Sequence, residues 1–196
     1  MTTEKKQLNW TNILFFTLTP LSVLILLPIA IWLHGVSWGM VLFFLVTYSL
    51  SNLSITAGYH RYFSHRSFDA HPVVEFLFML IGSGAFQGSV LEWATDHRRH
   101  HRAVDTDNDP YSIKKGFWHA HMGWLMYKDS PESRESFAPD LAKKAILRFQ
   151  DKHYALIATA VGFGLPLVIG YLLGWGWTGI VWGGALRIVC SNHSTF

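Results

Sequence analysis

Long uncharged apolar stretches, separated by polar ones, organise this chain. Residues 13–33 and 38–57 carry no charge, and each is about as long as the roughly 20 residues that a helix needs to cross a bilayer. Pro20 and Pro28 lie in the first stretch and are tolerated in lipid, although they would kink a soluble helix. Because only residues 34–37 separate the two stretches, the pattern predicts a transmembrane helical hairpin.

A second pair of apolar stretches lies near the other end of the chain. It consists of residues 153–174 and 177–190, joined at a GWGW turn. The last stretch is short for a membrane crossing, and Arg187 is expected near the point where it leaves the bilayer. We therefore predict an all-α membrane protein with four spans, arranged as two transmembrane helical hairpins.

The apolar segment between the two hairpins is ambiguous. Residues 73–91 are apolar enough to be considered a further span, but Glu75 lies inside the segment and Gly82, Gly84 and Gly88 interrupt it. Histidine groups follow both the second span and this segment. If the segment crossed the bilayer, the two groups would lie on opposite faces and could not share a metal ion. We therefore expect an interfacial helix that does not cross.

The positions of the basic residues test this arrangement. All 16 Lys and Arg residues lie in the N-terminal tail, between the two hairpins, or at Arg187, and the short hairpin loops contain none. By the positive-inside rule, both termini and the histidine-rich region between the hairpins are cytoplasmic. The latter is expected to form a cap on the membrane-spanning part.

The composition agrees with a membrane protein of about one domain. Half of the 196 residues are hydrophobic and 15% are charged, against about 25% in soluble domains. The single cysteine, Cys190, excludes an internal disulfide and the usual cysteine-rich zinc or iron–sulfur sites. We expect an integral membrane protein, of the bacterial inner membrane, with no nucleic-acid partner.

Five histidines on the expected cytoplasmic face are candidate metal ligands. His97, His100 and His101 stand at i, i+3 and i+4, which share one face of a helix. His60 and His65 are five apart, so they converge only if the helix ends or unwinds there. Imidazole is the commonest metal-binding side chain, and the combination predicts a metal site. Taken separately, the two groups also fit a solvated basic helix and an interfacial anchor.

The donor types narrow the choice of metal. Five imidazoles exceed what a closed zinc site uses, and ligand softness leaves iron, copper and zinc open. Iron fits best beside lipid, because redox chemistry at a hydrocarbon needs a metal that activates oxygen. Asp105, Asp107 and Asp109 follow the second histidine group, and we expect them to orient ligand rings. His119 and His121 are expected to brace the cap.

Four motifs together resemble those of the integral-membrane fatty acyl desaturases, specifically the bacterial branch similar to stearoyl-CoA desaturases. The motifs are HRYFSH, EWATDHRRHHRAVDTDNDP, KGFWHAHMGWLM and NHSTF, and the resemblance runs from the first span to the last residue. It implies one membrane desaturase domain over residues 1–196, with four transmembrane helices, a cytoplasmic cap and an interfacial helix before the second histidine box.

The resemblance also implies a non-haem centre of two iron ions held almost entirely by histidine. Carried over by position, the iron ligands are His60, His65, His97, His100 and His101. Trp93 and Asp96 match positions near the acyl-CoA headgroup and the mouth of the acyl tunnel. Thr195 and Phe196 match a threonine and an aromatic residue that border the acyl chain near the metals.

One departure from the family pattern concerns the end of the sequence. Family members continue past the position of Phe196 with an Asn-Ser-x-x-His stretch and a third histidine box, which complete the ligand set. His193 matches a position that is not a ligand. We therefore expect these 196 residues to be a fragment that is nearly inactive alone, because an incompletely ligated pair of irons should be lost or misplaced.

The implied reaction is the oxygen-dependent introduction of a double bond into a fatty acyl chain carried on CoA or on a membrane lipid. A mid-chain methylene has no acidic proton, so the cofactor must supply the hard step, with O2 as co-substrate. Nothing resembles a flavin or haem motif, which implies an external electron donor of the ferredoxin, rubredoxin or cytochrome b5 type. The basic residues Lys114, Lys115, Lys143, Lys144 and Arg148 could dock it or the acyl carrier's phosphates, although a positive-inside face explains them equally well.

Two alternatives stay open. The first is a related membrane di-iron hydroxylase acting on fatty acids or alkanes, which histidine boxes alone do not separate from a desaturase. The second is a non-enzymatic membrane metal-binding remnant or metal carrier. A carrier should place polar ligands within its spans, and these spans contain almost none.

Overall fold

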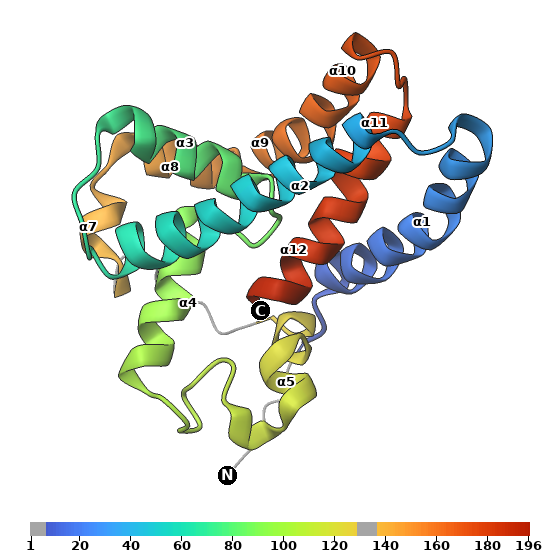
Figure 1. Cartoon of the computed structure of the whole chain (residues 1–196). Helices are drawn as coiled ribbons and strands as arrows, with labels where there is room; N and C mark the ends of the chain where they lie inside the picture. The colour runs from blue at the N-terminus through green and yellow to red at the C-terminus, as the bar shows by residue number, and fades with distance from the viewer. Residues whose placement is uncertain (1–6, 129–136) are drawn as a thin grey trace.

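The computed structural model describes residues 7–128 and 137–196 (Figure 1). In this part of the chain the regular secondary structure is helical, and the β-structure is limited to one isolated bridge between Leu8 and Tyr127. The predicted all-α class is therefore confirmed. The basic N-terminal tail with Lys5 and Lys6 lies outside the described residues.

The first predicted hairpin consists of α1 (Trp10–His34) and α2 (Trp38–Leu53). Asn9 and Ser37 cap these helices by accepting hydrogen bonds from backbone N–H groups in the first turn. The second span was predicted to end near residue 57. The helix instead continues beyond that point as a π-helix, η1 (Ser54–Ser64). The resulting 27-residue helix carries the first histidine motif on its last turns.

The third long apolar helix is built from α9 (Tyr154–Thr159), the π-helical η4 (Ala160–Gly164) and α10 (Leu165–Leu172). With α1 and the α2–η1 helix, it makes three described helices that are long and apolar enough to cross a membrane. The fourth expected span is not among these candidates. It corresponds to an unbroken helix of α11 (Thr178–Ile180), η5 (Val181–Leu186) and α12 (Arg187–Thr195).

This last helix lies at the centre of the bundle, which explains its weaker apolar pattern. It packs against α1, α2, η4 and α10, as Figure 1 shows, so it does not need a uniformly apolar surface. Gly170 and Gly179 lie where α10 and α11 cross, and a side chain at either would meet the other's backbone within about 3 Å. Arg187, expected near a bilayer exit, is instead buried, with 3% of its surface exposed.

The ambiguous segment 73–91 forms two helices instead of the single interfacial helix expected. α3 (Pro72–Ser83) has 12 residues and is about 18 Å long at about 1.5 Å per residue, too short for a hydrocarbon core of about 30 Å. The chain then turns at Phe86 and Gly88, which both have positive φ. Ser89 caps the next helix, α4 (Val90–Arg102), which carries the second histidine motif.

Shorter helices make up the region between α4 and the third long helix, where the cap was predicted, and among them α8 packs against α4. They are α5 (Phe117–His121), α7 (Pro139–Ala142), α8 (Ala145–Lys152) and the 3-10 turns η2 (Ile113–Lys115) and η3 (Gly123–Met126). A core that includes Tyr59, Phe63 and Leu147 joins η1, α3, α4 and α8. At its centre the fully buried Gln150 donates to Ser83 and Tyr59 and accepts from the N–H of Val90.

Candidate metal centre and adjoining cavity

The π-helix η1 brings the first two candidate ligands together. The backbone N–H of His65 donates to the carbonyl oxygen of His60 at 3.1 Å, which is the i→i+5 bond of a π-helix. The two imidazole ring centroids lie 4.7 Å apart. Their five-residue spacing, which does not fit one stripe of an α-helix, therefore suits the helix type that this segment adopts.

Helix α4 supplies two further histidines to the same point. The Nε2 atom of His97 lies 2.9 Å from that of His65 and 3.1 Å from that of His101. Ligand atoms of His60, His65, His97 and His101 all lie within 4.8 Å of one another. The structure thus gathers four of the five predicted histidine ligands into one group.

The spacing of these nitrogens fits a metal ion. Two ligands at about 2.0–2.1 Å from one ion are about 2.9 Å apart at a right angle and about 3.4 Å apart at the tetrahedral angle. The observed separations of 2.9 Å and 3.1 Å are closer to the right-angle value. These nitrogens therefore lie at separations that ligands of one metal ion adopt.

His65 and His97 are also in the protonation state that a metal ligand needs. Burial, with the neighbouring imidazoles as a second cause, lowers the pKa of His97 to about 3. Burial and the nearby His101 and Arg98 also lower the pKa of His65. Both rings are therefore neutral near pH 7 and have a lone pair available.

The fifth candidate, His100, lies on the same helix but outside this group. Its Nδ1 lies 2.9 Å from a carboxylate oxygen of Asp109, and its ring stacks on Tyr111 with centroids 4.4 Å apart. This contact fixes the ring through Nδ1, so Nε2 is the nitrogen that remains for a ligand bond.

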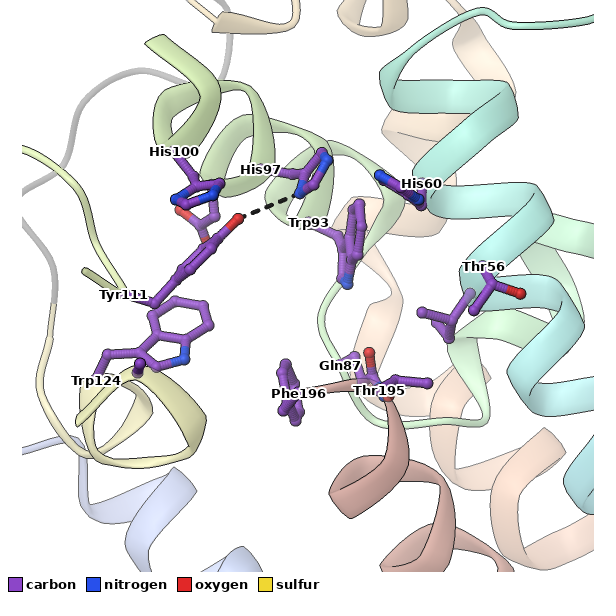
Figure 2. Close-up of a pocket in the computed structure, with 13 residues that line it drawn as sticks. Thr56, His60, Gln87, Trp93, His97, His100, Tyr111, Trp124, Thr195 and Phe196 are labelled. Atoms are coloured by element: carbon purple, nitrogen blue, oxygen red, sulfur yellow. Dashed lines mark hydrogen bonds between the residues drawn. The ribbon is translucent and has the colours of Figure 1, made fainter. Parts of the chain in front are cut away.

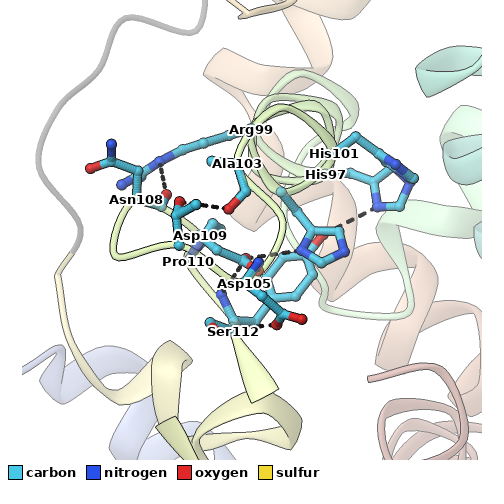
Figure 3. Close-up of polar contacts among 12 residues, drawn as sticks. His97, Arg99, His101, Ala103, Asp105, Asn108, Asp109, Pro110 and Ser112 are labelled. Carbon is cyan, nitrogen blue, oxygen red and sulfur yellow. Dashed lines mark hydrogen bonds and ion pairs between the residues drawn. The ribbon is translucent and has the colours of Figure 1, made fainter. Parts of the chain in front are cut away.

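The loop that follows α4 folds back beneath the helix and carries Asp109, as Figure 3 shows. Burial alone would raise the pKa of Asp109, but hydrogen bonds from His100 and from the N–H groups of Asp105 and Tyr111 outweigh it and lower the pKa. Asp105 accepts from Ser112, and Asp107 accepts from Lys115 through its backbone carbonyl. Of the three predicted aspartates, Asp109 is therefore the one that contacts a candidate ligand through its side chain.

Arg98, between the histidines of α4, joins the two motifs. It donates to the carbonyl oxygens of Phe63 and Ser64 at the end of η1, at 2.9 Å and 3.0 Å. Its guanidinium also pairs with both carboxylate oxygens of Asp140, at 2.6 Å and 3.2 Å. The last carbonyl groups of a helix have no donor within the helix. Here the guanidinium of Arg98, from the neighbouring helix, donates the missing hydrogen bonds. The contact holds η1 against α4.

A cavity of about 280 Å³ opens beside the histidine group (Figure 2). It is lined mainly by apolar surface and lies between the histidines of η1 and α4 and the end of α12. All four residues predicted to contact substrate line it: Trp93, Asp96, Thr195 and Phe196. Trp93 also stacks on His97, with ring centroids 4.8 Å apart, so one wall of the cavity supports a candidate ligand.

Other residues of the cavity were not predicted from the sequence. Tyr111 and Trp124 line it from the cap, and the Tyr111 hydroxyl lies 3.2 Å from Nδ1 of His97. Gln87 donates to Asn192 and Thr195, while its own Oε1 has no partner among the described residues. A polar residue in an otherwise apolar segment was a usable signal for Gln87. Nothing in the sequence spacing pointed to Tyr111 or Trp124.

The remaining histidines of the cap lie away from this group. His119 contacts the carbonyl oxygen of Pro110, as expected of a residue that braces the cap. His121 lies 2.9 Å from the carbonyl oxygen of Phe196 and 3.1 Å from His193. These contacts join α5 to the end of α12.

Comparison with known proteins gives concordant results. The family model for fatty acid desaturases matches residues 31–196. The chain is 36% identical over 194 residues to a probable acyl-CoA desaturase of Schizosaccharomyces pombe and 32% identical over 200 residues to acyl-CoA desaturase 1 of Saccharomyces cerevisiae. It is 38% identical over 198 residues to the sn-1 stearoyl-lipid 9-desaturase of Anabaena variabilis.

The matches cover nearly the whole of this chain but only part of its relatives. Each of the two yeast comparisons covers 97% of this chain, and the Anabaena comparison covers 100%. The chain spans 40% and 38% of the two yeast proteins and 69% of the Anabaena protein.

Proposed function

Because this chain belongs to the fatty acid desaturase family, we propose that it holds iron at the histidine group and takes part in introducing a double bond into a fatty acyl chain. The observation that carries the proposal is the position of the four-histidine group at the wall of a mainly apolar cavity. A metal beside such a cavity is suited to chemistry on a hydrocarbon. When bound, iron supplies the oxygen activation that removal of hydrogen from an unactivated methylene requires.

The protein's own part is to fix the ligands. In the tautomer that leaves Nε2 of His97 free to bind a metal, Nδ1 donates its proton to the Tyr111 oxygen. The pKa of Tyr111 is raised by burial and by nearby Asp96 and Asp109, so its hydroxyl keeps its proton at neutral pH. Asp109 holds His100 in the same way. We propose that His100 is the fifth iron ligand and that the five imidazoles serve two ions.

The cavity positions the substrate. Trp93 forms a flat wall beside His97, and Gln87 ties the loop before α4 to Thr195 at the end of α12. A narrow apolar space of this kind excludes water and restricts which carbon atoms reach the metal. We therefore propose that a mid-chain segment of the acyl group occupies it.

A second, polar cavity of about 130 Å³ adjoins the first. Asp96 and Trp124 line both cavities, and the second is also lined by the polar side chains of Asn9, Asn12, Arg99, Lys115 and Lys128. We propose that the acyl carrier's headgroup lies there, with Asp96 at the mouth of the acyl cavity. The carrier is CoA or a membrane lipid, since relatives of both kinds are similar to this chain.

The membrane arrangement completes the proposal. The three long apolar helices and the membrane-desaturase family indicate an integral membrane protein. We propose that the central helix Thr178–Thr195 serves as a fourth span and that the histidine group faces the cytoplasm, where an external carrier delivers electrons.

Expression of the gene that encodes this chain in a host with a suitable electron donor, followed by fatty acid analysis, tests the function. We expect a new double bond at one position, lost in His97→Ala. A new hydroxyl group instead of a double bond would assign the chain to the hydroxylases. Retention of the double bond in His97→Ala would contradict the role of the histidine group.

A further inference from the structure

Arg187 is a cation buried at the centre of the helical bundle, and its partners are all neutral. Its Nη1 donates to the hydroxyl of Ser51 and the carbonyl of Gly84, both at 2.8 Å. Its Nε and Nη2 donate to the carbonyls of Gly183 and Gly162, at 2.9 Å and 3.0 Å. A buried charge is costly unless it is well hydrogen-bonded, and these four bonds meet that need.

The three carbonyl acceptors lie at irregular points of the backbone. Gly162 belongs to the π-helical η4 and Gly183 to the π-helical η5, where a change in hydrogen-bond pattern occurs. Gly84 follows the end of α3, where helix carbonyls lack intrahelical partners. One guanidinium therefore fixes three backbone irregularities relative to one another.

The turn that follows α3 at Gly84 leads to the acyl cavity. Gly84 begins the turn that carries Phe86, a non-glycine residue with φ of 59°, and then Gln87, which lines the cavity. The Phe86 ring lies between those of Phe15 and Phe163, with centroids 4.9 Å and 5.3 Å away.

The backbone of η4 at Gly162 supports the same turn. A Cβ atom at Gly162 would lie 2.4 Å from Cε2 of Phe86, so the backbone that accepts from Arg187 also lies directly against this ring. Arg187 thus holds both the start of the turn and the surface on which Phe86 rests.

Arg187 also lies on the helix that ends at the cavity. It stands where the π-helical η5 passes into α12, and α12 ends at Thr195, which lines the cavity and accepts from Gln87. Figure 2 shows Gln87 beside Thr195 and Phe196, on the side of the cavity away from His97. The same side chain therefore fixes the start of the turn and the point at which η5 passes into α12, and both lead to the cavity.

We propose that Arg187 is a positioning residue that determines which carbon atoms of the acyl chain are oxidised. By fixing the turn and the start of α12, it sets how far the chain extends past the histidine group. This inference rests on the proposed function, because it assumes that the cavity holds the acyl chain. It requires no contact between Arg187 and the substrate.

The test introduces Arg187→Gln and Arg187→Lys into the same expression host that tests the proposed function. The position of the oxidised carbons in the products is then determined by mass spectrometry after derivatisation. We expect the share of product oxidised away from the main position to rise about tenfold, since small misplacements of substrate have large effects on reaction geometry. Iron per chain should stay unchanged. Phe86→Leu should also raise the share of product oxidised away from the main position. It alters the turn by removing the ring that packs against Phe15 and Phe163, and it leaves Arg187 unchanged.

Thr178→Val is the matched control. Thr178 is fully buried on the same helix, but its hydroxyl donates to Trp175, away from the turn. This variant should lower yield without changing the position of oxidation. If the Arg187 variants behave in the same way, Arg187 has only a structural role and the inference is wrong.

Two outcomes keep this inference separate from the proposed function. A wild-type protein that forms hydroxyl groups overturns desaturation, but the position of the hydroxyl still tests Arg187. If the Arg187 variants do not accumulate, Ser51→Ala removes one of the four acceptors and should give a smaller shift in the same direction. An unchanged ratio in Ser51→Ala would then count against the inference.

Discussion

The N–H of His65 donates to the carbonyl of His60, and this single i→i+5 bond places both imidazoles on the same side of η1. The π-helical turn therefore converts a five-residue spacing into a pair of neighbouring ligands. Arg98 then holds the end of η1 against α4, so that His65 meets His97. The candidate metal centre depends on helix type as well as on residue identity.

Substitution of the grouped histidines should remove iron. We expect His65→Ala and His101→Ala to lower the iron content of the purified protein at least about tenfold, because each removes one of the gathered nitrogens. Metal analysis of detergent-solubilised protein measures this directly. His34→Ala is the control, since His34 packs against Trp177 at the far end of α1 and should retain iron. Equal iron in all three variants would exclude the histidine group as the site.

Asp109 should contribute to metal affinity although it lies outside the four-histidine group. Asp109→Asn weakens the contact that orients His100, and loss of such a partner lowers affinity by about 10–100-fold. Asp107→Asn is the matched control, because Asp107 accepts from Lys115 through its backbone carbonyl, which the substitution keeps. Competition with a chelator compares the two affinities. Similar values for both variants would show that His100 does not bind metal.

Much of this architecture could be predicted from the sequence. The uncharged stretches indicated α1, α2 and the α9–α10 helix, and the desaturase motifs identified the family that the comparisons confirm. The five histidines and the four residues predicted to contact substrate were chosen by motif. The structure gathers four of these histidines and places the other four residues around one cavity, while their roles stay predictions. Hydropathy and motif spacing depend on local sequence, so the apolar helices and the family could be predicted.

What could not be predicted depends on tertiary packing. No local pattern distinguished the π-helix at His60 from a helix end. Gly82, Gly84 and Gly88 indicated an interruption, but no local pattern showed that a turn at Phe86 separates α3 from a second helix. Arg187 was read as a charge near the membrane surface, since only the packed bundle shows the carbonyl groups that surround it.

The ion pair between Arg98 and Asp140 should make cap stability depend on acidic pH. Burial would raise the pKa of Asp140, but hydrogen bonds from Arg98 and Arg66 outweigh it and lower the pKa to about 2. An unfolded Asp has a pKa of about 3.9, so the stabilisation is fully present above about pH 4. It should be lost as pH falls from about 4 towards 2.

Thermal unfolding of wild type and Asp140→Asn across this range measures the effect. The difference in melting temperature between the two proteins should narrow as pH falls. Glu75→Gln is the control, because it alters another ion pair of the same region, with Lys144. A constant difference between wild type and Asp140→Asn would show that the carboxylate does not stabilise the cap.

Tyr111 should affect the metal through His97 and not through cavity shape. Tyr111→Phe removes the hydroxyl 3.2 Å from Nδ1 but keeps an aromatic ring to stack on His100. We expect about tenfold weaker metal binding, because the His97 tautomer that leaves Nε2 free loses its partner. Tyr127→Phe is the control, since Tyr127 lines the polar cavity and is not in the histidine group. Spectra of the cobalt-substituted protein should change in Tyr111→Phe alone, and unchanged spectra would show that His97 is fixed by its stacking on Trp93.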